Sequence, residues 1–200
     1  MFINKYLLKL CCYQNSSTMS QQTDFAFKAL NVISWILFIG ICIEAGSIIF
    51  GMIFTLILRP AGTENLWIEV DLRNLYNYNV SHYITLNMLM IVTAVLKALM
   101  FYFIVSILHD KKLNLSKPFD EVTGKFISKL AYMALGIGLF SYQGAKFAAD
   151  LLEQGVKIPD VQHLRLAGAD VWIFMGVTLL VIAQLFKRGI EMQRENDLTI

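Results

Sequence analysis

Four apolar segments separated by polar ones dominate the pattern of the sequence. The first runs from Val32 to Leu58 with one charge, Glu44, and the second from Tyr83 to Leu108 with one charge, Lys97. About 20 apolar residues are enough to cross a bilayer as a helix, at a rise of about 1.5 Å per residue. Both segments are therefore long enough to span a membrane with some tilt.

The third and fourth apolar segments are shorter. One is uncharged from 130 to 145, and lysines at both of its ends can lengthen the span by reaching toward the head groups. The other, 171–186, extends upstream when Asp170 lies near the head groups. Re-entrant segments or buried helices are the alternative for runs this short. We favour four spans, because fewer would leave large apolar surfaces in water. Their expected ranges are about 32–58, 83–108, 127–149 and 166–186.

Composition supports a membrane protein. Of the 200 residues 56% are hydrophobic and only 16% are charged, against about 25% charged residues in soluble domains. The predicted fold is all-α, with four transmembrane helices in an antiparallel bundle. A net charge of +2 without a dense run of Lys and Arg gives no reason to expect a nucleic-acid partner.

The distribution of Lys and Arg predicts the orientation. The two ends and the segment between the second and third spans hold eleven of these residues, and the two opposite loops hold five. The side richer in Lys and Arg is the cytoplasmic one, so both termini are expected inside. The chain then divides into a cytoplasmic segment 1–31, a transmembrane domain 32–186 and a cytoplasmic tail 187–200. Residues 1–18 are interpreted as a dispensable extension, with Met19 as an alternative start.

Two charges within the first two spans are expected to meet. Because these helices run in opposite directions, Glu44 and Lys97 lie at matched depth, about 16–18 Å from the cytoplasmic end. A charge at the centre of a bilayer costs about 2.5–3.5 kcal/mol or more, and is usually turned inward and paired. We predict an ion pair that holds the two helices in register. The alternative is that the pair lines a polar cavity for an ion or small ligand. Asp170 is expected near the head groups, within reach of Lys146 or Arg165.

A stripe of small residues marks one face of the third span. Its members follow steps of four, three, four and four, and such stripes let helices approach closely in lipid. We interpret it as a packing face inside the bundle, which makes this helix central, in preference to a homodimer face. The stripe consists of Ala134, Gly138, Ser141, Ala145 and Ala149.

Motifs that carry enzyme chemistry do not occur in the sequence. There is no phosphate-binding loop, nucleophile elbow, zinc-protease helix or Cys-x-x-Cys pair. His82 and His163 are predicted on the outer side and His109 on the inner side, so no metal site is expected. We therefore expect no enzyme activity and no cofactor.

The C-terminal run from Phe186 to Ile200 is the most distinctive stretch. It joins a basic Lys-Arg-Gly segment to Glu195, Asn196, Asp197, Leu198, Thr199 and Ile200. This run, together with Pro118-Phe119 before the third span, resembles an uncharacterised family of bacterial four-helix membrane proteins, a domain of unknown function. The resemblance covers about residues 25–200 as a layout. It implies a bacterial inner-membrane location and, since such genes often lie beside a helix-turn-helix regulator, a regulatory setting.

These observations favour an interaction or regulatory component of the membrane. Its partners would be the bilayer, a protein that docks on the cytoplasmic tail through residues 195–200, and further copies of the chain. The alternative is a transporter or channel subunit that uses Glu44 and Lys97. Four helices are few for a monomeric transporter, so that alternative requires an oligomer.

Overall fold

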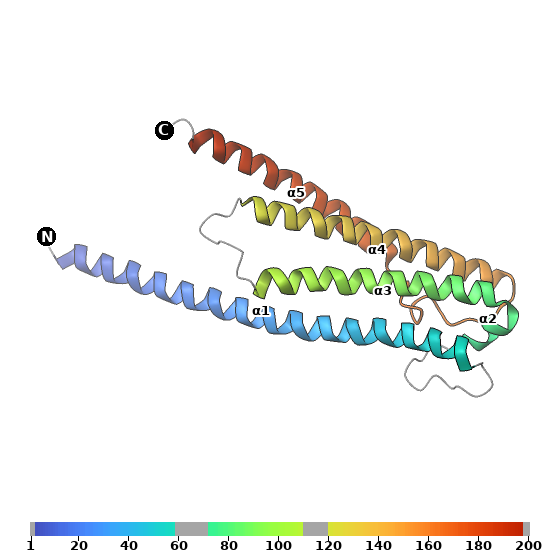
Figure 1. Cartoon of the computed structure of the whole chain (residues 1–200). Coiled ribbons are helices and arrows are strands. Elements are labelled where there is room, and N and C mark those ends of the chain that lie inside the picture. The colour runs from blue at the N-terminus through green and yellow to red at the C-terminus, as the bar shows by residue number, and fades with distance from the viewer. Residues whose placement is uncertain (1–2, 59–71, 110–119, 198–200) are drawn as a thin grey trace.

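The fold is all-α throughout the part of the chain that can be described. The computed structural model describes residues 3–58, 72–109 and 120–197, with side chains for 28–57, 72–109 and 120–195. Within these ranges there are five helices and no strand, which confirms the predicted class (Figure 1). The helices are α1 (Ile3–Leu58), α2 (Arg73–Tyr78), α3 (Val80–His109), α4 (Glu121–Glu153) and α5 (Ala169–Asp197).

The four long helices form an open row in sequence order. α1 packs against α3, α3 against α4, and α4 against α5, each pair antiparallel, while the short α2 packs on α3 (Figure 1). Within the described ranges, α1 does not pack against α4 or α5. The predicted antiparallel order is therefore present, but the row is not closed into a bundle. Both termini lie at the same end of the row.

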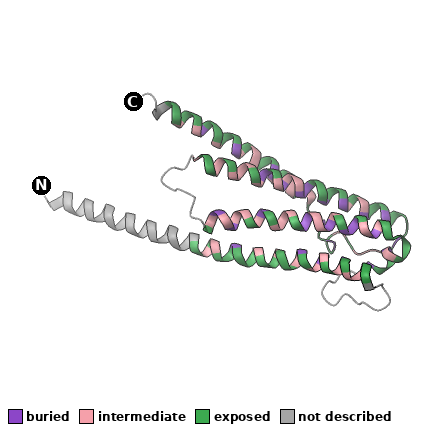
Figure 2. Cartoon of the chain, viewed as in Figure 1, coloured by how far each residue is buried: buried purple, intermediate pink, exposed green. Residues whose placement is uncertain are grey.

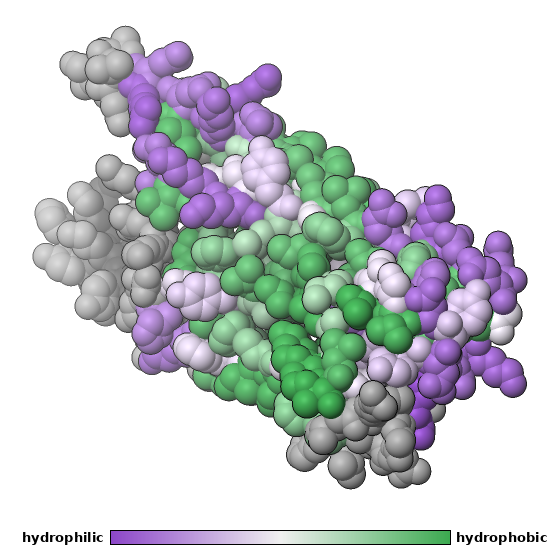
Figure 3. Space-filling view, turned by 45° about the vertical axis from the view of Figure 1, so that its right-hand side comes forward, coloured by the Kyte–Doolittle hydropathy of each residue, from purple (hydrophilic) through white to green (hydrophobic). Residues whose placement is uncertain are grey.

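Three helices are long and apolar enough to cross a membrane. Their apolar parts are Lys28–Ile57, Val80–His109 and Ala169–Glu195. α4 does not meet the same standard, because Lys129 and Lys146 bound its apolar run, and glycines, hydroxyl groups and Gln143 lower the mean hydropathy further. Apolar residues cover the middle of one face of the molecule, and hydrophilic residues lie toward both ends (Figure 3). This pattern is typical of a membrane protein, although the count of four spans stays a prediction.

The outward faces of the two outer helices, α1 and α5, are apolar and exposed. Ile57 on α1 is 73% exposed and Phe174 on α5 is 74% exposed. Exposed positions run along residues 28–57 of α1 and residues 169–195 of α5 (Figure 2). In water these faces would be unfavourable, but in a bilayer they contact lipid chains.

The small-residue stripe places α4 between its two neighbours. Ala134, Gly138 and Ser141 are buried as predicted, but Ala145 is only half-buried and Ala149 is exposed. The buried face continues instead through Gly144 and Ala148. A helix turns once every 3.6 residues. Two successive steps of four residues therefore rotate a position away from the buried face, whereas a step of three residues rotates it back. The helix packs on both sides, against α3 and α5.

Glycines bring α4 and α5 into close contact. A Cβ atom at Gly138 would lie 2.5 Å from Cγ1 of Ile173, 2.9 Å from its backbone nitrogen and 3.1 Å from the carbonyl oxygen of Ala169. On the α5 side, a Cβ at Gly176 would lie 2.7 Å from Cγ of Leu135. Only glycine fits either position without moving the helices apart. Since Gly138 is near the middle of α4, α5 begins beside the centre of its neighbour and not at its end.

The connection between α4 and α5, residues 154–168, fills the space that this late start leaves. Its Leu164 and Leu166 are fully buried and Val156 nearly so. They belong to the same apolar core as residues of α1 and α3, among them Ala45 and Leu86. A Cβ at Gly144 would lie 2.8 Å from Cδ1 of Leu166, so glycine also makes room for this segment on α4. The connection therefore folds back along the helices to half their length.

Ser141→Ala is expected to leave the protein as stable or more stable, by up to about 1 kcal/mol. Ser141 is fully buried, and its hydroxyl has no hydrogen-bond partner within the described residues. Removing a buried polar group without a partner removes its desolvation cost. The measurement is thermal unfolding of the purified protein in detergent. Ser128→Ala is the control, because the Ser128 hydroxyl donates to the Gly124 carbonyl at 3.0 Å. A loss of stability in Ser141→Ala would show that the hydroxyl has a partner, such as a water molecule.

Candidate functional site

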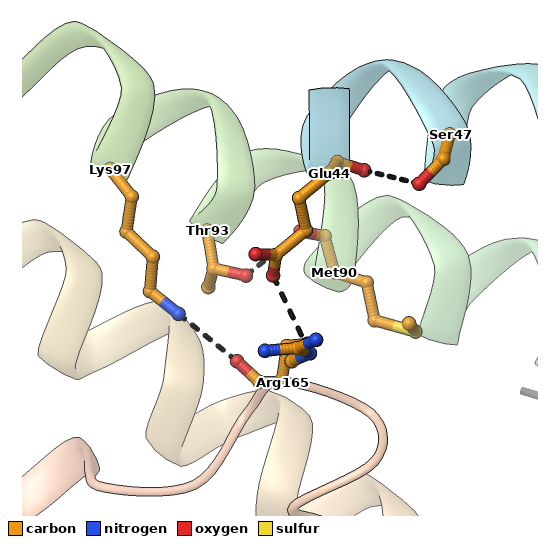
Figure 4. Close-up of polar contacts among 6 residues, drawn as sticks. All are labelled: Glu44, Ser47, Met90, Thr93, Lys97 and Arg165. Atoms are coloured by element: carbon orange, nitrogen blue, oxygen red, sulfur yellow. Dashed lines mark hydrogen bonds and ion pairs between the residues drawn. The ribbon is translucent and has the colours of Figure 1, made fainter. Parts of the chain in front are cut away.

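A hollow of about 280 Å³ lies where α1, α3 and the 154–168 connection meet. α1 contributes Glu44, α3 contributes Lys97 and the connection contributes Arg165 (Figure 4). Both helical residues lie near the middle of the apolar parts of their helices. The remaining lining residues are Ile41, Ala94, Gln162, Ala167 and Trp172. The hollow thus combines three charged groups with an apolar surround.

Arg165 joins the two helical charges. Its Nε lies 3.7 Å from Oε1 of Glu44, and its carbonyl oxygen accepts a hydrogen bond from Nζ of Lys97 at 3.1 Å (Figure 4). The carboxylate therefore contacts the side chain of Arg165, while the ammonium group contacts its backbone. Charges of opposite sign at such distances attract strongly where water is scarce.

The backbone of Arg165 is held in an unusual conformation. Its φ is +57°, the one positive value for a non-glycine residue in the described ranges. This left-handed region is sparsely populated by residues with a Cβ. The fully buried neighbours Leu164 and Leu166 anchor the residue on both sides, and the amide of Leu166 donates to the carbonyl of Val161 at 3.2 Å. The turn aims the Arg165 side chain and its carbonyl oxygen into one site.

The site has more positive than negative groups. Two cations and one carboxylate line the hollow, so its formal charge is +1. Nζ of Lys97 also lies 5.9 Å from the centre of the Trp172 ring, within the range of a cation–π contact. Trp172 stands in the first turn of α5. Side chains of α1, α3, the 154–168 connection and α5 thus converge on one place.

The predicted charges meet in the structure, but through a third residue. Glu44 and Lys97 line the same hollow at matched positions, while the ion pair that Glu44 makes there is with Arg165. The sequence predicts Asp170 within reach of Lys146 or Arg165, but Asp170 forms no ion pair within the described residues. Two signals were present in the sequence: the apolar residues Leu164 and Leu166 on both sides of Arg165, and Gly168, whose φ of +79° lets the chain turn into α5.

The predicted docking tail is a continuation of α5. Residues 187–197 are helical, and Glu195 is exposed and has an interaction partner. Asn196 and Asp197 close the helix, whereas Leu198, Thr199 and Ile200 lie outside the described residues, as does Pro118-Phe119. Nη2 of Arg194 lies 3.4 Å from Oε2 of Glu121, which ties the last turns of α5 to the start of α4. A hydrogen bond from Lys125, and then the charges of Lys125 and Arg194, lower the pKa of the exposed Glu121 carboxyl.

The N-terminal division stays a prediction. α1 is one helix from Ile3 to Leu58, so it runs without a break across the predicted boundaries at residues 18 and 31. α4 begins at Glu121, after an extended Asp120, close to the start predicted from Pro118. No three His, Cys, Asp or Glu side chains gather as a metal site within the described ranges.

Together, the all-α fold and the three helices that are long and apolar enough to cross a membrane indicate a helical membrane protein. The chain belongs to the family described as "Protein of unknown function (DUF2975)", whose profile matches residues 71–200. This confirms the resemblance to an uncharacterised family. The matched region includes Lys97 and Arg165, and α1 with Glu44 precedes it. Neither the curated proteins nor the solved structures contain a match to the chain.

Proposed function

We propose that this protein is a regulatory component of the membrane that acts by contact with other molecules. The hollow between α1, α3 and the 154–168 connection would receive the signal, and the end of α5 would carry it to a protein partner on the cytoplasmic side. The proposal extends to a multi-pass location in a bacterial inner membrane, with both termini inside.

One observation carries the proposal: α5 links the hollow directly to the chain end. Trp172 in its first turn lines the hollow, and the same helix continues without interruption to Asp197. Its last turns are mostly exposed, and Met192 is 60% exposed among charged residues. An exposed apolar side chain on a helix face is the kind of anchor that partner grooves accept. A change at the hollow therefore has a continuous route to a surface suited to docking.

A transporter or channel subunit is the second candidate. The hollow with Glu44 and Lys97 favours it, since ionisable groups within membrane helices often mark an ion pathway. The open row counts against it, because four helices side by side enclose no path. A second copy would have to complete such a path. The two candidates therefore predict different results in cells and in liposomes.

Removal of residues 191–200 is expected to abolish regulation while leaving the fold intact. A chain that ends at Ile190 keeps the contact of Ile190 near Gly124 and loses Arg194, Glu195 and the docking surface. Transcripts would be compared in cells without the gene and in cells that carry the whole or the shortened chain. We expect a set of transcripts to change on deletion and to return only with the whole chain. Thermal unfolding of the shortened protein should stay within about 1 kcal/mol of the whole chain.

Glu121→Gln is the control for this truncation. It removes the negative charge that faces Arg194 and leaves the tail in place, so transcripts should return to normal. Full recovery with the shortened chain would eliminate the tail as the docking element. Unchanged transcripts on gene deletion, combined with ion flux into dye-loaded liposomes that hold the purified protein, would overturn the regulatory role in favour of transport.

A further inference from the structure

The charged groups at the hollow have unused hydrogen-bond donors. Nε of Arg165 lies 3.7 Å from the carboxylate of Glu44, and its side chain donates no hydrogen bond within the described residues. Lys97 has three donors and gives one to the carbonyl of Arg165. The side chain of Arg165 is 65% exposed and that of Glu44 is 32% exposed. The hollow therefore presents positive donors toward open space, halfway along the apolar helices.

Such donors need an acceptor when lipid surrounds the helices. Positive groups left unpaired in hydrocarbon are costly, and an anion that brings oxygen acceptors removes this cost. We propose that the hollow binds the carboxylate group of an amphipathic anion, with its apolar part against the faces of α1 and α3. The guanidinium of Arg165 would hold the carboxylate through its terminal nitrogens, and Lys97 would donate to it from the other side.

The charge and shape of the hollow select this chemistry. A formal charge of +1 matches a monoanion, whereas a doubly charged phosphate would leave the site negative. A guanidinium offers paired donors that fit the two oxygens of a carboxylate. The volume of about 280 Å³ lies at the lower end of small-ligand pockets. Ile41, Ala94 and Trp172 add apolar walls for the carbon atoms next to the carboxylate.

A second copy of the chain fits the same place less well. Two copies related by a twofold axis would bring identical surfaces together, so two sites that each carry +1 would face each other. Like charges repel, most strongly where water is excluded. A second copy would place a further positive site against the hollow, whereas an anionic ligand neutralises its charge.

Glu44 has a particular place in this proposal. Its carboxylate lies 3.7 Å from Nε of Arg165, beside the terminal nitrogens that would hold the ligand. The carboxylates of Glu44 and of the ligand would therefore repel each other. Removal of the Glu44 charge should therefore improve binding of the ligand. A cation site would behave in the opposite way, since it would depend on that carboxylate.

Quenching of Trp172 fluorescence tests the proposal. With Trp35→Phe and Trp67→Phe, Trp172 is the one remaining tryptophan. The purified full chain in detergent is titrated with a bromine-carrying twelve-carbon carboxylate, and separately with its uncharged methyl ester. We expect saturable quenching by the acid and at least tenfold weaker quenching by the ester. Equal quenching by both compounds would overturn the proposal, because it would indicate simple partition into the micelle.

Variants separate the roles of the three charges. Arg165→Gln and Lys97→Met should each weaken binding about tenfold or more, while Lys146→Met, which removes an exposed lysine of α4, should leave it unchanged. Glu44→Gln should tighten binding severalfold. Loss of binding in Glu44→Gln, or no effect of the two cation variants, would overturn the proposal. Arg165→Lys retains the positive charge but removes the paired donors of the guanidinium. If Arg165→Gln does not fold, this variant replaces it and should also weaken binding.

Competition identifies the source of the carboxylate. Displacement of the brominated acid by millimolar acetate would indicate a small ligand from water, and resistance to acetate would indicate a long-chain acid from the bilayer. Both results support a carboxylate site. The inference rests on the proposed function only for what ligand binding does in the cell, namely that it changes regulation. Binding with unchanged transcripts would overturn regulation alone, and tail-dependent transcripts without binding would overturn this site alone.

Discussion

Gly138→Ala is expected to destabilise the protein by about 2–3 kcal/mol and to loosen α5 from α4. The new methyl group would lie 2.5 Å from Cγ1 of Ile173 and 2.9 Å from its backbone nitrogen. A side chain can rotate away, but a backbone atom cannot, so the two helices must separate. Overpacking of a filled interface costs about 1–3 kcal/mol. Thermal or denaturant unfolding in detergent measures the effect.

Glycines elsewhere in the chain provide a matched control. A Cβ at Gly40 or Gly46 meets no atom within 4 Å, so alanine there should be neutral or slightly stabilising, as helix propensity favours alanine over glycine. Ile173→Ala in the Gly138→Ala background should recover part of the lost stability, because it removes the side-chain clash. Recovery should be incomplete, because the backbone nitrogen of residue 173 stays in place. Equal stability of Gly138→Ala and Gly40→Ala would contradict the close contact of α4 with α5.

Glu44→Gln and Arg165→Gln are each expected to cost about 1–2 kcal/mol and to be strongly coupled. Removal of Glu44 leaves two cations without a carboxylate at the hollow, and removal of Arg165 leaves Glu44 without its ion-pair partner. Loss of one partner costs about 3–5 kcal/mol in a fully buried pair. The partial exposure of both side chains and the 3.7 Å separation reduce this effect. The double variant should cost less than the sum of the two single variants, with a coupling energy of about 1 kcal/mol. Unfolding of the purified ligand-free protein measures all three.

A second double-mutant cycle, with Glu44→Gln and Lys97→Met, tests the direct ion pair that the sequence predicts. The ammonium group of Lys97 donates to the carbonyl oxygen of Arg165, so its coupling to Glu44 should be weaker than that of Arg165. Stronger coupling between Glu44 and Lys97 than between Glu44 and Arg165 would restore the direct ion pair as the main contact.

Apolar periodicity and helix length predicted much of the fold. The first two spans, the all-α class and the burial of Ala134, Gly138 and Ser141 follow from side-chain pattern alone. The open row does not, because the sequence of one helix says which face is small or apolar and not which neighbour covers it. The late start of α5 depends on how tightly Gly138 and Gly176 fit their partners, a property of three-dimensional packing.

The candidate site was predicted only in part, because part of it depends on three-dimensional packing. Matched depth on antiparallel helices brought Glu44 and Lys97 together, since that argument needs only the rise per residue. Arg165 was assigned to an outer loop near Asp170. Its true position depends on the burial of Leu164 and Leu166 and on a left-handed turn, and local pattern does not specify how far a connection folds back into a structure.

The close contact between Gly176 and Leu135 gives α5 the geometry of a lever. Seven residues separate this contact from the start of the helix at Ala169, and 21 separate it from the end at Asp197. Because every residue of a helix adds the same rise, the second arm is about three times as long as the first. A tilt about this pivot that moves Ala169 by about 1 Å moves Asp197 by about 3 Å in the opposite direction. A small displacement at Trp172 would thus become a larger one at the end of α5 when the contacts of Ile190 with Gly124 and of Arg194 with Glu121 are released.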